Sequence, residues 1–321
     1  MNPEKGIVGI QNMGNTCYCN STIQLLRACP EWNTFCLTND VSDNTILSAY
    51  KDILTSLWSA SKPAYVRPLG FLNEIKKAVK GTVYEMFGFP IPNDSHEFLV
   101  YLLDRFHETI KTDIPYHEIH SNTMQHRAQN GWNKFISKNN SAIVDIFFGM
   151  IRKTIYCTNC NNNTYQWDVF NSLKIPCEGN TLKEWIQNEL ISTNIEGYKC
   201  ENCNLHTNAT IYSHIWKLPS SLFITIRRFH PNGSKNMTSC PYTGEDIHLS
   251  EFFAEESDDP SKNWKYEIRG ISDHHGSHMG GHYTAYFKHP LNEWWHIDDE
   301  SATKQLPNFS ASNYIFFFRR I

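Results

Sequence analysis

The chain has 321 residues, of which 29 are lysine or arginine and 33 are aspartate or glutamate, giving a net charge of −4. This length fits one large domain or two to three closely packed subdomains. The hydrophobic share of 40% can fill a core, which argues against a disordered chain, and the mildly acidic balance lacks the basic footprint of a nucleic-acid binder.

Targeting signals are not evident in the sequence. Its first six residues lack the apolar core of a secretory signal, and no apolar run approaches the ~20 residues that cross a bilayer. We therefore expect a soluble monomer of the cytoplasm, the nucleus or both, with neither membrane nor nucleic acid as a partner. The ten cysteines of such a chain are not expected to form a disulfide framework.

The first informative segment, residues 12–21, reads Asn-Met-Gly-Asn-Thr-Cys-Tyr-Cys-Asn-Ser. Asn15 and Thr16 are good N-cap residues, and apolar residues follow at near-helical spacing over 17–29. This pattern predicts that Cys17 lies at a helix N-terminus. The partial positive charge there lowers the pKa of a thiol and favours a nucleophilic thiolate. Asn12 can donate its amide to a developing oxyanion. Alternatively, Cys17 is a buried structural residue, and Cys19 offers a competing thiol.

A stronger helix is predicted from Asp94, which begins an Asp-Ser-His-Glu sequence with the form of a capping box. Its apolar positions recur on one face of a helix of 3.6 residues per turn. These positions are Leu99, Leu102, Leu103, Phe106 and Ile110.

Two Cys-x-x-Cys pairs occupy the middle of the chain, Cys157 with Cys160 and Cys200 with Cys203. Two such knuckles supply the four thiolates of a tetrahedral structural zinc site, which leaves no open position for catalysis. The gap between the pairs exceeds the ~15–20 residues of a compact finger, so we expect two β-hairpin tips joined by long strands. Redox-active or unliganded pairs are the alternative, and the identical spacing counts against them.

Strand-like segments dominate from about residue 146, separated by Gly, Pro, Asn and Asp clusters. A helical first half and a β-rich second half predict an α+β fold, with an active site in the cleft between the two parts. The expected strands are 222–226, 266–271, 282–287, 294–297 and 314–318.

Candidate partners for the thiol lie in this β-rich half. Gly280 and Gly281 let a substrate backbone pass close to His282, after a predicted glycine loop over 274–281. The next strand ends in Asp298 and Asp299, and a turn around 290–292 would set Asp298 beside His282, where it would fix the imidazole tautomer. The alternative is an ordinary hairpin whose aspartates cap a turn.

In this order, the motifs resemble those of the ubiquitin-specific proteases of the papain-like class, from about residue 7 to residue 320. The Cys box of that family stands at 9–21, and its His box stands at 280–286, followed by 294–299. The four paired cysteines match its zinc ribbon, 218–229 match its Leu-Pro…Arg-Arg-Phe strand, and 313–319 match its last strand.

The resemblance implies a hand-like α+β fold made of a helical thumb (1–145), zinc-ribbon fingers (146–215) and a β-rich palm (216–321). Together they form one catalytic domain, a minimal core of about 7–320. It further implies a thiol-dependent deubiquitinase, which hydrolyses the isopeptide or peptide bond after the C-terminal glycine of ubiquitin through a thioester. Ubiquitin and ubiquitinated proteins are the implied partners, and Zn²⁺ held by the four cysteines is the implied cofactor.

Residue roles follow from the same resemblance. Cys17 is the nucleophile, His282 the general base and then acid, and Asp298 the third member of the triad. Asn12 helps form the oxyanion hole, and Asp299 is an adjacent helper that can share the third role. Three cleft residues contact the ubiquitin tail, namely Asp94, Gly280 and Gly281.

The sequence departs from the family pattern at three places. Pro92-Asn93 replaces Gln-Gln, Cys19 replaces a methionine, and Asp273-His274-His275 replaces Asn-His followed by an aromatic residue. The departures put the tail contacts in doubt and remove no catalytic group. Three other functions remain open: a protease for a ubiquitin-like modifier, an inactive ubiquitin-binding pseudoenzyme, and a zinc-ribbon nucleic-acid module, against which the acidic balance argues.

Overall fold

The computed structural model describes residues 5–41, 45–61, 63–190, 192–277 and 280–321. Helices fill most of the first 147 residues, and strands dominate from residue 149 onward. None of the helices in these ranges combines the length and the apolar character needed to cross a membrane. The predicted α+β class is confirmed.

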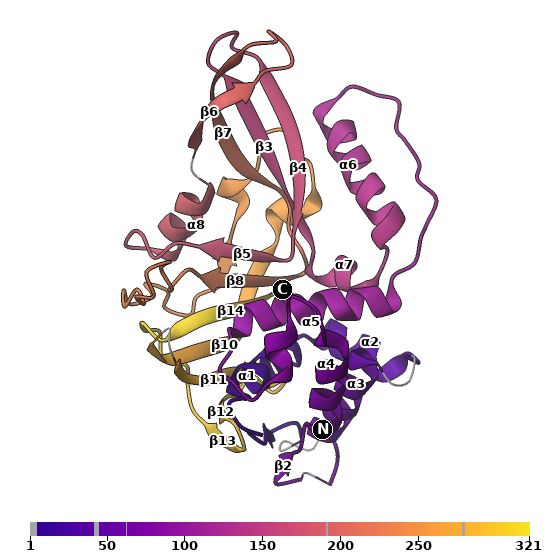
Figure 1. Ribbon diagram of the computed structural model, residues 1–321, viewed down its shortest axis with the longest axis vertical. Helices are drawn as coiled ribbons and strands as arrows, with labels where there is room; N and C mark the ends of the chain where they lie inside the picture. Colours follow the sequence, from indigo (N-terminus) through magenta and orange to yellow (C-terminus); the bar gives the residue numbers. More distant parts are fainter. Residues whose placement is uncertain (1–4, 42–44, 62, 191, 278–279) are drawn as a thin grey trace.

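The helical part is built around a buried α1 (Figure 1). All ten residues of α1 are buried, and the helix packs against α5 on one side and against β10 and β11 on the other. Asp94 caps α5 as predicted, since its carboxylate accepts a hydrogen bond from the Glu97 N–H at 2.8 Å. The helices are α1 (Cys17–Leu26), α2 (Pro30–Thr38), α3 (Ile46–Leu57), α4 (Leu69–Val79), η1 (Glu85–Gly88), α5 (Ser95–Ile110), α6 (Met124–Asn139) and α7 (Ala142–Phe147).

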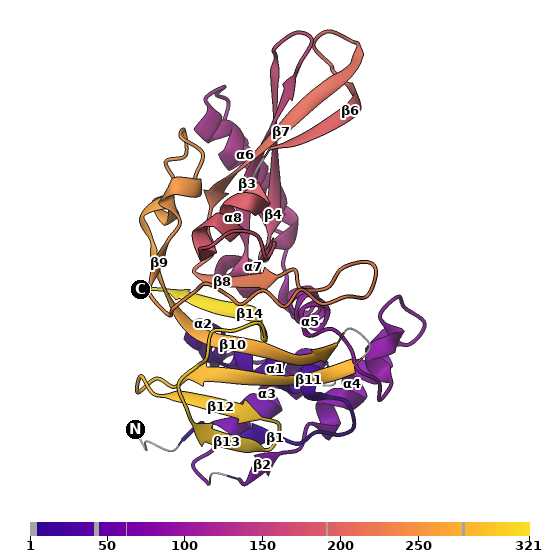
Figure 2. The ribbon, with the colours of Figure 1, turned by 90° about the vertical axis from the view of Figure 1, so that its left-hand side faces the viewer.

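The larger sheet has eight strands in the order β13-β12-β11-β10-β14-β8-β5, with β9 paired to β10. Figure 2 shows β13 to β14 stacked beside the helical part. All pairings are antiparallel except the parallel pair β5–β8. The strands are β5 (Ser172–Ile175), β8 (Ser221–Ile226), β9 (Ile247–His248), β10 (Lys265–Ser277), β11 (Gly280–Lys288), β12 (Trp294–Asp298), β13 (Ser301–Lys304) and β14 (Asn313–Arg320).

A second sheet of four antiparallel strands, in the order β4-β3-β7-β6, projects away from the helical part (Figure 1). Helix α6 lies beside this sheet, and the Arg127 guanidinium of α6 stacks over the rings of Tyr165 and Trp167 on β4. The strands are β3 (Gly149–Cys157), β4 (Asn163–Phe170), β6 (Thr193–Lys199) and β7 (His206–Lys217). The remaining elements are α8 (Leu182–Leu190), η2 (Ser250–Phe252), η3 (Pro260–Asn263) and the parallel pair β1 (Gly9–Ile10) and β2 (Tyr65–Val66).

One buried core joins the helical part to the large sheet. Phe223 of β8 packs on Phe147 of α7, with ring centroids 5.5 Å apart, and on Phe317 of β14, at 5.1 Å. All three rings are fully buried. Burial of this kind stabilises by about 1.5–3 kcal/mol per side chain, so the packing of these rings holds the helices and the sheet in a fixed relation.

The five predicted strands are present, but β10 is longer than expected and extends to Ser277. The predicted glycine loop over 274–281 is therefore wrong for most of its length, because β10 and β11 stay paired from Asp273–Thr284 to Ser277–Gly280. Residues 278 and 279 of that prediction lie outside the described residues. His282 lies on β11, in agreement with the strand predicted over 282–287. The predicted helix over 17–29 ends at Leu26.

Candidate active site

Asn12 shapes the turn that leads into α1. Its side-chain oxygen accepts hydrogen bonds from the backbone N–H groups of Gly14, at 3.0 Å, and Thr16, at 3.1 Å. The chain between them is left-handed, with φ of +96° at Gly14 and +54° at Asn15. Glycine and asparagine tolerate this conformation better than other residues do. The turn delivers Cys17 to the first position of α1, as predicted.

The Cys17 side chain is only 7% exposed. Burial raises the pKa of its thiol, the Asp299 carboxylate raises it further, and the backbone N–H of Tyr283 opposes the rise. The direction is opposite to the predicted lowering of this pKa, because burial disfavours the charged thiolate. Within the described structure, no hydrogen bond joins Cys17 to His282.

His282 and Asp298 meet through the pairing of β11 with β12. Nε2 of His282 lies 2.6 Å from Oδ1 of Asp298, and the two side chains are 42% and 48% exposed. The predicted juxtaposition of these residues is thus confirmed. With Nε2 held by the carboxylate, the imidazole has a fixed orientation and Nδ1 is left for proton transfer.

Asp299 has a different set of partners. Its backbone is left-handed, with φ of +48°, and its carboxylate accepts hydrogen bonds from the side-chain amides of Asn20, at 2.7 Å, and Asn12, at 2.9 Å. The distance from Asp299 to Nε2 of His282 is 3.9 Å. Asp298 is therefore the carboxylate that orients the imidazole, while Asp299 positions the amide of Asn12.

Two residues that sequence reasoning missed complete this arrangement. Asn20 holds Asp299, and the carboxylate of Glu300 accepts a hydrogen bond from the Asn12 backbone N–H at 3.1 Å. A side chain at Gly9 would lie 2.3 Å from the Asp299 backbone oxygen, so the two segments are in direct contact. Asn20 lies three residues after Cys17 and Glu300 directly follows the aspartate pair, but only the fold shows what they bind.

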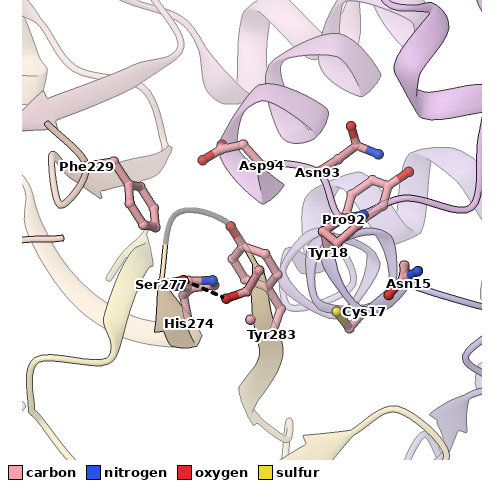
Figure 3. Close-up of a pocket in the computed structure, with 12 residues that line it drawn as sticks. Asn15, Cys17, Tyr18, Pro92, Asn93, Asp94, Phe229, His274, Ser277 and Tyr283 are labelled. Carbon is pink, nitrogen blue, oxygen red and sulfur yellow. Dashed lines mark hydrogen bonds between the residues drawn. The ribbon is translucent and has the colours of Figure 1, made fainter. Parts of the chain in front are cut away.

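Cys17 opens onto a cavity of about 280 Å³ (Figure 3). The predicted residues Asp94, Gly280 and Gly281 line it together with residues that sequence reasoning did not single out, including Phe229, His274 and Tyr283. In Figure 3, Asp94 and Phe229 stand at one end and Cys17 at the other. The cavity continues past them into a second hollow of about 560 Å³ that shares both residues. Together the two hollows form an extended cleft that ends at Cys17.

The walls of this cleft are fixed by packing. Asp94 caps α5 and accepts a hydrogen bond from the Tyr314 hydroxyl at 2.5 Å. A side chain at Gly281 would lie 2.4 Å from Nε2 of His274, whereas one at Gly280 would meet nothing within 4 Å. Burial and then the Lys235 ammonium lower the pKa of His274 to about 4, so its ring is neutral. Gly281 thus lets β11 lie flat against His274 and keeps the cleft open.

The four paired cysteines meet at the tips of the β3–β4 and β6–β7 hairpins, as predicted. All four sulfurs lie within 4.8 Å of one another, and those of Cys160 and Cys200 are 3.7 Å apart. A tetrahedral site with Zn–S bonds of about 2.3 Å requires sulfurs about 3.8 Å apart. The Asn202 amide donates to Cys160 and lowers the pKa of its thiol to about 6. The cluster can therefore hold a structural metal ion.

Comparison with known proteins places these features in one family. The family model described as ubiquitin carboxyl-terminal hydrolase matches residues 8–318. The chain belongs to the ubiquitin carboxyl-terminal hydrolase family. It is 27% identical to ubiquitin carboxyl-terminal hydrolase Usp2 of Drosophila melanogaster, over 98% of this chain and 35% of that protein. It is 24% identical to ubiquitin carboxyl-terminal hydrolase 2 of Bos taurus, over 98% of this chain and 55% of that protein.

The chain thus spans about a third to a half of the length of these two relatives. Among solved structures, it resembles a chain of the SAGA DUB module Ubp8/Sgf11/Sus1/Sgf73 bound to monoubiquitin, with a TM-score of 0.79, 21% identity and coverage of 100% of this chain and 70% of that one. The same module bound to ubiquitin aldehyde gives a TM-score of 0.77 with 21% identity, over 100% of this chain and 71% of that one. This likeness confirms the predicted fold of this family.

The raised pKa of Cys17 predicts how its reactivity depends on pH. Alkylation by iodoacetamide follows the thiolate fraction, so in the ligand-free protein its rate at Cys17 should be slow at pH 7 and still rise above about pH 8.5, where an ordinary thiol titrates. Rates measured from about pH 6 to 10 by peptide mapping, with Cys17→Ser as the background control, test this. A rate that is already constant by pH 7 would instead show a thiolate paired with an imidazolium.

Proposed function

We propose that this chain is a cysteine-type deubiquitinase, which hydrolyses the isopeptide or peptide bond after the C-terminal glycine of ubiquitin. One observation carries the proposal: Cys17 ends a narrow cleft lined by Gly280 and Gly281, and the next residue on that strand, His282, is held by Asp298. Family membership supports the reaction class. The ubiquitin held by solved relatives supports the identity of the partner.

In the first step, the Cys17 sulfur attacks the carbonyl carbon of the last glycine while His282 takes the thiol proton. The oxyanion accepts hydrogen bonds from the Cys17 backbone N–H and from the N–H of the Asn12 amide that Asp299 leaves free. His282 then gives its proton to the departing lysine amine, the C–N bond breaks, and ubiquitin remains on Cys17 as a thioester.

In the second step, neutral His282 takes a proton from water, and the resulting hydroxide attacks the thioester carbon. The C–S bond breaks, Cys17 recovers its proton from His282, and ubiquitin leaves with a free carboxylate. Asp298 stays ionised throughout and stabilises the imidazolium that forms in each step.

The cleft accounts for the choice of bond. Two glycines at the end of a peptide present no side chains, so they fit between Cys17 and the surface formed by Gly280 and Gly281. Asp94, at the far end of the first hollow, faces the preceding part of the tail. Pro92 and Asn93 line the cleft where the family pattern has two glutamines, so the contacts with the tail differ in detail.

We assign residues 1–145 to a thumb, 146–215 to fingers and 216–321 to a palm, which together grip ubiquitin. Zn²⁺ is the ion that we assign to the four cysteines, since four thiolates at near-tetrahedral spacing suit it. Cys157, Cys160, Cys200 and Cys203 would hold it. Its role is structural, because it would tie the two hairpin tips together.

The decisive test is reaction with ubiquitin that carries a C-terminal electrophile, followed by intact mass measurement and peptide mapping. We expect one ubiquitin to be added per chain, on Cys17. Cys17→Ala should form no adduct yet still bind ubiquitin, and Cys36→Ala, which removes another buried thiol, should react fully. Adduct formation by Cys17→Ala would eliminate Cys17 as the nucleophile, and binding without any adduct in the parent chain would identify a pseudoenzyme.

The geometry also separates the roles of the two aspartates. Asp298→Ala should lower kcat for a fluorogenic ubiquitin substrate by roughly 10²-fold with little change in KM, because His282 loses the carboxylate that orients it. Glu293→Ala removes an acid from the turn between the same two strands and should leave kcat within about twofold. An unchanged kcat for Asp298→Ala would transfer the third role to Asp299.

Loss of one metal ligand should release the metal. We expect Cys200→Ser to reduce bound zinc, measured by mass spectrometry of the metal content, from about one equivalent per chain to nearly none, and to lower Tm. Cys36→Ser removes a buried thiol elsewhere and should keep its zinc even if Tm falls, which separates metal loss from general destabilisation. A parent chain without zinc would contradict the assignment.

A further inference from the structure

Metal-binding side chains from three neighbouring strands gather beside the cleft. Strands β10, β11 and β12 lie next to one another (Figure 2). His275 on β10 is the direct partner of His282 on β11. Directly opposed residues of antiparallel strands share a face of the sheet, with their Cβ atoms about 4.5–5.5 Å apart. Asp298 of β12 lies 2.6 Å from His282 on the same side.

His275 has no part in the cleft described above. Its neighbour His274 is buried, and its ring packs 4.6 Å from the ring of Tyr283. Side chains alternate along a strand, so His275 points to the other side, where it is exposed. It stands where the family pattern has an aromatic residue, which makes this second imidazole a feature of this chain.

Two of the three groups already lie together, and both are open to solvent. Metal-binding atoms of His282, Asp298 and Asp299 lie within 4.8 Å of one another, while the His275 ring lies outside this cluster. Hydrogen bonds from Asn12 and Asn20 occupy the Asp299 carboxylate, which leaves Asp298 as the available oxygen ligand. An ion can reach this place, because the side chains of His282 and Asp298 are 42% and 48% exposed.

We propose that His275, His282 and Asp298 form an inhibitory site for a divalent transition-metal ion such as Zn²⁺. Two imidazoles and one carboxylate are donors that these ions favour, at bond lengths of about 2.0–2.2 Å. The ion takes the place of the hydrogen bond between His282 and Asp298, while the exposed His275 ring turns toward it and supplies the third ligand. Binding of the ion does not depend on the proposed function.

Its inhibitory effect does rest on the proposed function. The ion occupies a lone pair of the His282 imidazole and adds positive charge beside it, so His282 can no longer accept the proton of Cys17. It also separates the imidazole from the carboxylate that orients it. The site is distinct from the four-cysteine cluster, which lies at the tips of the projecting sheet.

The binding test uses the full chain with its cysteine cluster already loaded with zinc, and the Cys17→Ala variant to remove the thiol as a ligand. Calorimetric titration with ZnCl₂ should show one further equivalent bound. Adding His275→Ser should weaken that binding at least about tenfold, since loss of even an outer-shell partner costs 10–100-fold. His248→Ser, which removes an exposed histidine of β9, should leave binding within about twofold.

Two outcomes would overturn the site. If Cys17→Ala abolishes the further equivalent, the ligands are the thiol and His282; if His275→Ser leaves the affinity unchanged, His275 is not a ligand. Turnover of the ubiquitin substrate adds a separate readout. His275→Ser should keep the activity measured without added metal and raise the zinc concentration for half-inhibition at least about tenfold. Zinc binding as described without any ubiquitin hydrolysis would refute the proposed function and leave the metal site standing.

Discussion

The whole site depends on the Asp299 carboxylate, which ties the two ends of the chain together. It receives the amides of Asn12 and Asn20 from the start of the chain, and its backbone oxygen accepts the Ile10 N–H at 2.7 Å. An ionised acceptor makes stronger hydrogen bonds than a neutral one. This turn therefore fixes the Asn12 amide, the first turn of α1 and the position of Asp298 in one arrangement. Its left-handed backbone is maintained because so many partners hold it in place.

Burial of Cys17, by contrast, disfavours the thiolate form of its side chain. Cys17 is only 7% exposed, which protects its thiol from solvent and from small oxidants, and the same burial raises the pKa of that thiol. One wall of the cleft in front of it is closely packed, since Gly281 packs against His274 and the Phe229 ring faces that of His274 at 5.2 Å. These contacts fix the shape of the cleft in front of Cys17.

The sequence indicated those parts of the structure that local rules determine. Cap residues and apolar spacing located the starts of α1 and α5, and the paired cysteines indicated two hairpin tips. Short apolar segments bounded by Gly, Pro, Asn and Asp located the strands. The triad order came from the resemblance to a family as much as from the residues. The juxtaposition of His282 and Asp298 followed from a short turn between two strands, which is the simplest connection available to them.

Features that depend on tertiary contacts could not be predicted from the sequence. The pKa of Cys17 is raised by burial, which no local sequence pattern encodes. Strand β10 extends to Ser277 because it pairs with β11, although the sequence of this segment is rich in glycine. The partners of Asp299 lie 279 and 287 positions away in the sequence. Asn12 and Asn20 both lie in the Cys box, but no sequence motif links them to a residue so far along the chain.

The place of β14 in the sheet has a consequence for synthesis of the protein. This last strand lies between β10 and β8, so it is inserted into the middle of the sheet and not added at its rim. Until residues 313–320 have left the ribosome, β8 and β10 have unpaired inner edges, and the buried rings of Phe316, Phe317 and Phe318 are missing from the core. A nascent chain thus carries Cys17, His282 and Asp298 before it has the strand that joins β8 to β10, so the large sheet closes late in synthesis.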